Sequence, residues 1–132
     1  MRGTDNMYLC YQILTILMNI EDFREYCLSK PATTECFPFD ENTLVFKVAG
    51  KMFALTDIVD KFSINLKCDP ETAIELREHH DCVHPGYHMN KKHWNTIIVD
   101  DSVSDILLKE WIDNSYNLIV RSLNKNQRAF LD

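Results

Sequence analysis

The chain of 132 residues has only three glycines, at positions 3, 50 and 86. A loop that cradles phosphate needs several glycines close together, so the sequence contains no nucleotide-binding loop of that kind. The GxSxG motif of serine hydrolases and the HExxH zinc motif are also absent. We therefore expect a protein without catalytic activity and without a cofactor.

Positive charge is also scarce. The 20 acidic residues outnumber the 14 basic residues, which gives a formal net charge of −6. This balance argues against a protein that binds nucleic acid through bulk positive charge. It still allows a local basic surface, which has to be sought segment by segment.

The cysteines lack the pattern of a disulfide framework. They stand at positions 10, 27, 36, 68 and 82, form no CxxC pair and are odd in number. Secreted disulfide-rich proteins usually have an even number of cysteines in a shorter chain. We therefore expect reduced thiols in a cytoplasmic protein.

No hydrophobic run is long enough to cross a membrane. The longest apolar stretch, residues 7–18, falls well short of the roughly 20 residues that a spanning helix needs. Three interpretations of residues 1–17 stay open: they precede a true start at Met18, they extend the first helix, or they serve export or membrane contact. We expect an N-terminal extension outside the domain and no membrane partner.

The remaining sequence alternates between helix and strand patterns. Helices are expected at about 19–29, capped by Asn19, at 70–79 after Asp69-Pro70, and over a long segment after a cap at Ser102. Strands are expected at 36–39, in a hairpin over 43–55, at 62–68 and at 95–99. In the hairpin the turn Ala49-Gly50 would pair Val48 with Lys51, Lys47 with Met52 and Phe46 with Phe53.

This order predicts a single α+β domain over residues 18–123, followed by a polar tail at 124–132 that frays. Its element order is α-β(4)-α-β-α, with an antiparallel sheet of about five strands and three packed helices.

Several segments of this chain resemble the MmcQ/YjbR family, in that family's order and over residues 18 to about 123. They read MNIEDFREYCLSKP, FPFDENTLVFKVAGKMFAL, INLKCDPE and PGYHMNKKHWNTIIVDDSV. The resemblance implies a small α+β domain similar to CyaY-like and type III secretion chaperone folds, and DNA binding through a double-wing motif. The chain departs from the family at Pro31-Ala32, where relatives tend to have a glycine nearby, and at 79–84, which is unusually rich in His and Cys.

The residues themselves offer a place for such binding. Segment 82–99 has no acidic residue, and it interleaves lysines, which suit phosphates, with aromatic rings, which suit bases. One wing would be residues 47–51 and the other residues 87–93, with Asn90 donating to a base edge. The candidate contacts are Lys47, Lys51, Lys67, Tyr87, His88, Asn90, Lys91, Lys92, His93 and Trp94.

Other interpretations of the same residues stay open. Tyr87 and Trp94 are large aromatic residues that more often belong to a core, and few lysines would give only weak, salt-sensitive DNA binding. The alternative is a protein- or small-ligand-binding module with no nucleic-acid role. A zinc site at His80, Cys82, His84 and His88 is a further hypothesis, but the spacing matches no standard finger and we expect no metal.

Overall fold

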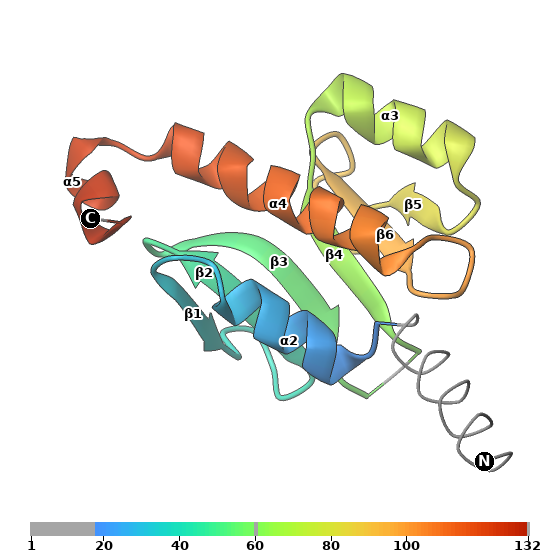
Figure 1. Cartoon of the computed structure of the whole chain (residues 1–132), viewed down its shortest axis with the longest axis horizontal. Coiled ribbons are helices and arrows are strands. Elements are labelled where there is room, and N and C mark those ends of the chain that lie inside the picture. Colours follow the sequence, from blue (N-terminus) through green and yellow to red (C-terminus); the bar gives the residue numbers. More distant parts are fainter. Residues whose placement is uncertain (1–17, 60, 132) are drawn as a thin grey trace, which may run out of the picture.

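One antiparallel sheet of six strands organises the molecule, in the order β1-β2-β3-β4-β6-β5 (Figure 1). The computed structural model describes residues 18–59 and 61–131, so residues 1–17 and the predictions made for them lie outside it. The strands are β1 (Thr33–Cys36), β2 (Thr43–Val48), β3 (Lys51–Asp57), β4 (Ser63–Lys67), β5 (Val83–Pro85) and β6 (Trp94–Ile98). The predicted α+β class with an antiparallel sheet is confirmed.

Three helices cover one face of this sheet (Figure 1). They are α2 (Ile20–Leu28), α3 (Pro70–His79) and α4 (Asp105–Ser122). Asn19 begins α2 with a capping box, because its side chain accepts from the Asp22 N–H and Asp22 accepts from the Asn19 N–H. Asp69 takes the cap position of α3 ahead of Pro70, although its side chain makes no cap hydrogen bond. Two short helical turns, α5 (Lys125–Arg128) and η1 (Ala129–Leu131), follow α4 in the segment predicted to fray.

The main core lies between these helices and the sheet. Phe23 of α2 is fully buried and makes edge-to-face contacts with Phe46 and Phe62, with ring centroids 5.5 and 6.1 Å apart. From α4, Leu108 and Ile112 reach the same cluster. On the opposite face of the sheet, which we call the open face, the described residues form a small buried cluster of Val45, Leu55 and Trp94. Side chains of alternate strand residues therefore enter very different surroundings.

The β2–β3 hairpin has a bulge that the sequence did not indicate. Near the turn the predicted pairs Val48–Lys51 and Lys47–Met52 are confirmed. The predicted pair Phe46–Phe53 is wrong, because the register shifts between Phe46 and Lys47, so that Phe46 pairs with Ala54. The extra residue is Phe53, which is fully buried against Tyr116 with ring centroids 5.2 Å apart. The bulge keeps this large ring on the helix-covered side.

Other boundaries also differ from the predictions. The final helix begins after Ser104, whose side chain accepts from the Leu107 N–H at 3.1 Å. Ser102, the predicted cap, instead donates from its backbone N–H and its hydroxyl to Asp100. Residues 83–85, predicted as loop, form the edge strand β5, which raises the number of strands to six. The first strand ends at Cys36, so Pro38 lies beyond it.

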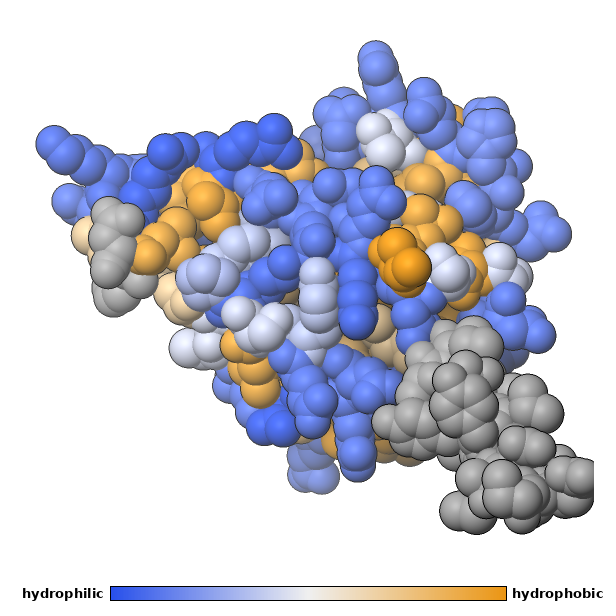
Figure 2. Space-filling view, in the orientation of Figure 1, coloured by the Kyte–Doolittle hydropathy of each residue, from blue (hydrophilic) through white to orange (hydrophobic). Residues whose placement is uncertain are grey.

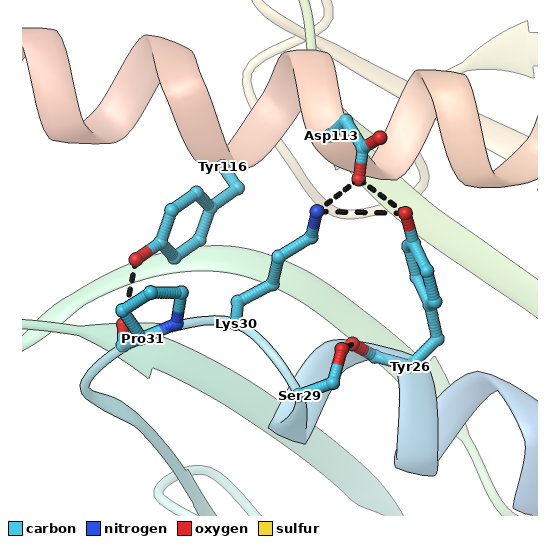
Figure 3. A network of polar contacts seen from close by, with 6 residues as sticks. All are labelled: Tyr26, Ser29, Lys30, Pro31, Asp113 and Tyr116. Atoms are coloured by element: carbon cyan, nitrogen blue, oxygen red, sulfur yellow. Dashed lines mark hydrogen bonds and ion pairs between the residues drawn. The ribbon is translucent and has the colours of Figure 1, made fainter.

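A polar cluster joins α2 to α4 at the edge of the core (Figure 3). Lys30 pairs with the carboxylate of Asp113, and the Tyr26 hydroxyl donates to the same oxygen at 2.6 Å. The Lys30 ammonium also lies 4.8 Å from the ring centre of Tyr26 and 5.9 Å from that of Tyr116. The Tyr116 hydroxyl donates to the Pro31 carbonyl at 2.6 Å. The cluster holds the chain segment that leads from α2 into the sheet.

Within the part of the chain that the structure describes, no helix combines the length and the apolar character needed to cross a membrane.

Candidate nucleic-acid interface

The antiparallel pairing brings the predicted contact segments to one end of the sheet. Strand β2 ends and β3 begins at the Ala49-Gly50 turn, where both residues have positive φ angles of 49° and 82°. Strand β4 ends at Lys67, which pairs with Trp94 at the start of β6. Strands β3 and β6 are separated only by β4, so the two predicted wings lie about 10 Å apart at their strand ends. We call this end of the sheet the basic end.

Three lysines project from strands at the basic end. Lys47 points to the open face and Lys51 pairs with Val48, whose side chain enters the main core. Lys67 shares the open face with its partner Trp94. All three are half-buried, so their methylene stems rest on the sheet while their charged heads can reach solvent.

The loop between β5 and β6 is fastened at several points. The Tyr87 N–H donates to the Thr96 hydroxyl at 2.9 Å, and the Cys68 N–H donates to the His93 carbonyl at 2.7 Å. A Cβ at Gly86 would lie 2.9 Å from both the Cβ and the carbonyl oxygen of Trp94. Gly86 is therefore required by close packing. Residues 84–87 read HPGY, which suits a type II turn, but Gly86 lacks the positive φ angle that this turn requires, since among the described residues Gly50 is the glycine with a positive φ angle.

Arg77 of α3 positions this loop, and sequence reasoning missed it. Its guanidinium donates to the Asn95 side chain at 2.7 Å and to the carbonyls of Lys91 and Trp94. The available signal in the sequence was a single arginine in the last turn of a predicted helix whose other charged side chains are mostly acidic.

The second predicted wing, residues 87–93, lies in this loop, and its two halves lie in different places. Its second half, from Asn90 to His93, stays at the basic end. There Lys92 is exposed, whereas the Lys91 ammonium donates to the Gly86 carbonyl at 2.8 Å. Asn90 accepts from the Lys92 N–H at 2.9 Å and so shapes the loop itself. Lys92 and His93 are the loop residues whose charged or polar groups remain available at the basic end.

The first half of the loop folds over the open face. Met89 packs on the cluster of Val45, Leu55 and Trp94, while Tyr87 and His88 stand exposed beyond it. Trp94 is only 8% exposed under this cover. Its ring therefore belongs to the small open-face core, and we leave it out of the proposed interface.

Arg121 extends the basic end from the helical side. It lines a hollow between α3 and α4 together with Lys67 and Cys68. Its neighbour Arg128 donates to the Leu123 carbonyl at 3.1 Å and to the Arg121 carbonyl at 3.2 Å, which places a further cation nearby. Neither arginine was predicted, because the last turn of a helix and the tail are remote in sequence from the two wings.

A separate groove of 610 Å³ crosses the open face. Its floor is made of alternate strand residues, which include Leu55, Ser63, Asn65 and Thr96. The β1–β2 connection supplies one wall with Phe39 and Asp40, and the folded-over loop supplies the other with Tyr87, His88 and Met89. A volume in this range suits a small-molecule ligand or part of a larger one.

The hollow between α3 and α4 is smaller, at 160 Å³. Apolar residues gather at the surface between these two helices (Figure 2). The thiol of Cys68 lines the hollow, and its burial together with the nearby carboxylate of Asp69 raises its pKa to about 11. Burial also raises the pKa of Cys27. Both thiols are therefore protonated at neutral pH, which makes them poor nucleophiles.

The residues of the zinc hypothesis are dispersed. The His80 ring packs against Trp111 with centroids 5.1 Å apart, and Cys82 is buried in the main core. His84 lies on β5 and His88 on the loop that covers the open face. Among residues 18–59 and 61–131, no three His, Cys, Asp or Glu side chains are grouped so that they could hold a metal ion.

Comparisons with known proteins match this chain over most of its length. The family model YjbR matches residues 28–118. The chain belongs to the YjbR family. It is 36% identical over 109 residues to "Uncharacterized protein YbdF" of Escherichia coli O157:H7, covering 82% of this chain and 89% of that protein. It is 32% identical over 115 residues to "Uncharacterized protein YjbR" of E. coli K12, covering 86% and 98%.

Solved structures of similar proteins support the same fold. The Deinococcus radiodurans protein DR2400, with family-model domain DUF419, superposes with a TM-score of 0.81 at 42% identity, covering 87% of this chain and 88% of that one. A Pseudomonas syringae protein superposes with a TM-score of 0.67 at 28% identity, covering 76% and 98%. The arrangement of sheet and helices is thus shared with these two proteins.

Proposed function

We propose that this YjbR-family protein binds DNA without catalysing a reaction, through the basic end of the sheet. The observation that supports the proposal is the convergence of lysines from β2, β3, β4 and the β5–β6 loop at one end of adjacent strands. Lys47, Lys67 and Lys92 present ammonium groups suited to phosphates, and Arg121 adds a fourth cation beside Lys67. A few such contacts give weak binding that salt readily screens.

The acidic groups of the chain limit this surface. Asp69 and Glu71 begin α3 close to Lys67, and the protein as a whole carries a formal net charge of −6. Non-specific DNA binding therefore depends on the local cations and fails where they are removed. We expect binding at about 50 mM salt that fades steeply toward physiological salt.

Charge reversal tests the proposal with a matched control. Lys47→Glu and Lys92→Glu should each weaken binding to a short DNA duplex by roughly three- to tenfold at low salt and reduce the salt slope by about one. Lys109→Glu makes the same change of charge on α4, beside α2, and should have little effect. Equal losses for all three variants, or no binding by the wild type at about 50 mM salt, would contradict the proposal.

A module that binds a protein or small ligand, with no nucleic-acid role, is the second candidate. The groove on the open face favours it, because exposed aromatic side chains line a hollow that no part of the described chain fills. Duplex binding that is absent at every salt concentration, together with a ligand that protects this groove, would favour this candidate.

A further inference from the structure

Exposed apolar side chains are concentrated around the groove on the open face. Seven large hydrophobic residues are exposed in the described part of the chain, and five lie in the connections β1–β2, β3–β4 and β5–β6. Two of these five line the groove itself, Phe39 at 63% and Tyr87 at 66% exposure. Exposed apolar side chains that are grouped in this way often mark a binding surface, whereas single scattered ones do not.

The two aromatic residues stand on connections that the structure fixes. Next to Phe39, the Asp40 carboxylate accepts from the N–H groups of Asn42 and Thr43 at 2.9 and 2.8 Å. The Asn42 carbonyl in turn accepts from the Ile58 N–H at 2.8 Å, which joins two connections. The rings are therefore presented by ordered loops, so binding would cost little conformational entropy.

Tyr87 is held on the other side of the groove. Its N–H donates to the Thr96 hydroxyl at 2.9 Å, and its ring meets the ring of His88 edge-on with centroids 5.5 Å apart. His88 has a φ angle of 56°, in the left-handed region that few residues other than glycine adopt. This backbone turns the loop so that Tyr87 lies on the groove while Met89 packs beneath it.

The floor of the groove offers hydrogen-bond donors and acceptors to a flat ligand edge. The Thr96 hydroxyl donates to the Asn65 side-chain oxygen, so the amide nitrogen of Asn65 is the donor that this side chain has left to offer. Ser63 and Thr43 add hydroxyl groups along the same floor. Unpaired nucleobases combine two stacking faces with an edge of donors and acceptors, which is what these walls and this floor complement.

Charge decides which part of a nucleotide enters. Hydrogen bonds from Asn42 and Thr43 hold the pKa of Asp40 below its usual range, so this wall is negatively charged at neutral pH. Asp57 adds a second carboxylate, and both repel a phosphate from the groove. The cations lie at its margins, with Lys61 at one end and Lys47 and Lys67 further along the open face. This distribution of charge suits a nucleic acid whose bases lie inside the groove and whose phosphates lie outside it, near the lysines.

We propose that the groove binds unpaired bases of a single-stranded nucleic acid, stacked on Phe39 and Tyr87. The inference rests on the proposed function in taking nucleic acid as the ligand, but it names single strands and a different set of contacts. In a duplex the base faces are covered by neighbouring pairs, so only a single strand can offer them to two exposed rings.

The test uses a fluorescently labelled octamer of deoxyadenylate, measured by anisotropy at about 50 mM salt with the full chain. Phe39→Ala/Tyr87→Ala should weaken binding of this single strand by roughly tenfold or more and leave duplex binding within about twofold. The matched control is Ile74→Ala/Ile106→Ala, which removes apolar side chains that are 52% and 81% exposed on the helices. This control should bind the single strand as the wild type does.

The outcomes separate this inference from the proposed function. Loss of single-strand affinity in the aromatic variant, with no duplex binding by any protein, would support the groove and contradict the basic-end proposal. Unchanged single-strand affinity in the aromatic variant would overturn the groove, even if Lys92→Glu still weakened duplex binding. If deoxyadenosine monophosphate bound as tightly as the octamer, the inference would also be overturned, because the groove would then bind a free nucleotide.

Discussion

The two faces of the sheet are built from alternate residues of the same strands, yet helices cover one face and leave most of the other exposed. On the covered face, Phe46 and Ile64 are fully buried beneath α2 and α4. On the open face, Val45 and Leu55 form a small cluster with Trp94, against which Cys36, Met52 and Met89 pack. Polar side chains line much of the groove beside this cluster. Because most of the buried apolar side chains of the described residues lie on the covered face, we expect this face to supply most of the stability of the fold.

The largest expected effect is on the free energy of unfolding, when one phenylalanine on each face of the sheet is replaced by alanine. Phe46→Ala removes a fully buried ring that contacts Phe23, and should lower the free energy of unfolding by about 3–5 kcal/mol. Phe39→Ala removes a ring that is 63% exposed, and should change it by less than about 0.5 kcal/mol. Urea denaturation of both variants measures the contrast. Similar losses would show that the open face contributes to stability as the covered face does.

Arg77 lies on the covered side of the sheet but holds the loop that folds over the open face. Its removal should therefore affect both the stability of the fold and the order of this loop. Arg77→Met leaves the side-chain oxygen of Asn95, which is 2% exposed, without its donor, and should cost about 1.5–3 kcal/mol. Amides of the β5–β6 loop should also exchange with solvent faster. Arg121→Met, an exposed position, is the control and should leave both measurements near wild type. Unchanged loop exchange in Arg77→Met would show that other contacts hold the loop.

The smallest effect concerns the polar cluster at the edge of the covered face. Burial lowers the pKa of Lys30, but its hydrogen bond and ion pair with Asp113 outweigh this and leave the pKa raised. Burial, with the hydrogen bond to Asp113, also raises the pKa of Tyr26. Both groups are protonated in the folded protein at a pH where the unfolded chain has begun to lose these protons. Their contribution is therefore complete below about pH 10 and is lost as the pH rises through the folded-state values.

Denaturant midpoints at pH 8 and pH 11 measure this loss in the reduced protein. Tyr26→Phe/Lys30→Met removes both titrating groups and should give a smaller difference between the two pH values than the wild type. Phe39→Ala, which leaves the cluster intact, should keep the wild-type difference. A double variant that loses as much stability at pH 11 as the wild type would place the alkaline sensitivity elsewhere.

Local sequence signals predicted the elements whose cause is local. Asn19 with Asp22, Pro70 after Asp69, and the Ala49-Gly50 turn fix their backbone within a few residues, and each marks an element boundary in the structure. Ser102 shows the limit of such signals. Asp100 captures its hydroxyl and N–H, so the cap of α4 moves to Ser104.

The candidate site was predicted less completely because its geometry depends on long-range contacts. Phe53, the extra residue of the bulge, packs against Tyr116, which is 63 residues away, and no periodicity in the hairpin reveals this bulge. The loop after β5 reverses over the open face through Tyr87 and Thr96, which separates residues that are adjacent in sequence. For this reason Trp94 is covered while Tyr87 is exposed, although both were predicted as stacking residues.

We propose that nucleic acid contacts the open face of the sheet, from the groove to the lysines of the basic end. A titration of the isotopically labelled protein with a short single-stranded oligonucleotide, followed by backbone amide chemical shifts, tests it most directly. The largest changes should fall on the groove and its walls, at Phe39, Asn65, Tyr87, His88 and Thr96, with smaller ones at Lys47 and Lys67. Changes confined to α2 and α4, or no changes at about 50 mM salt, would contradict the account.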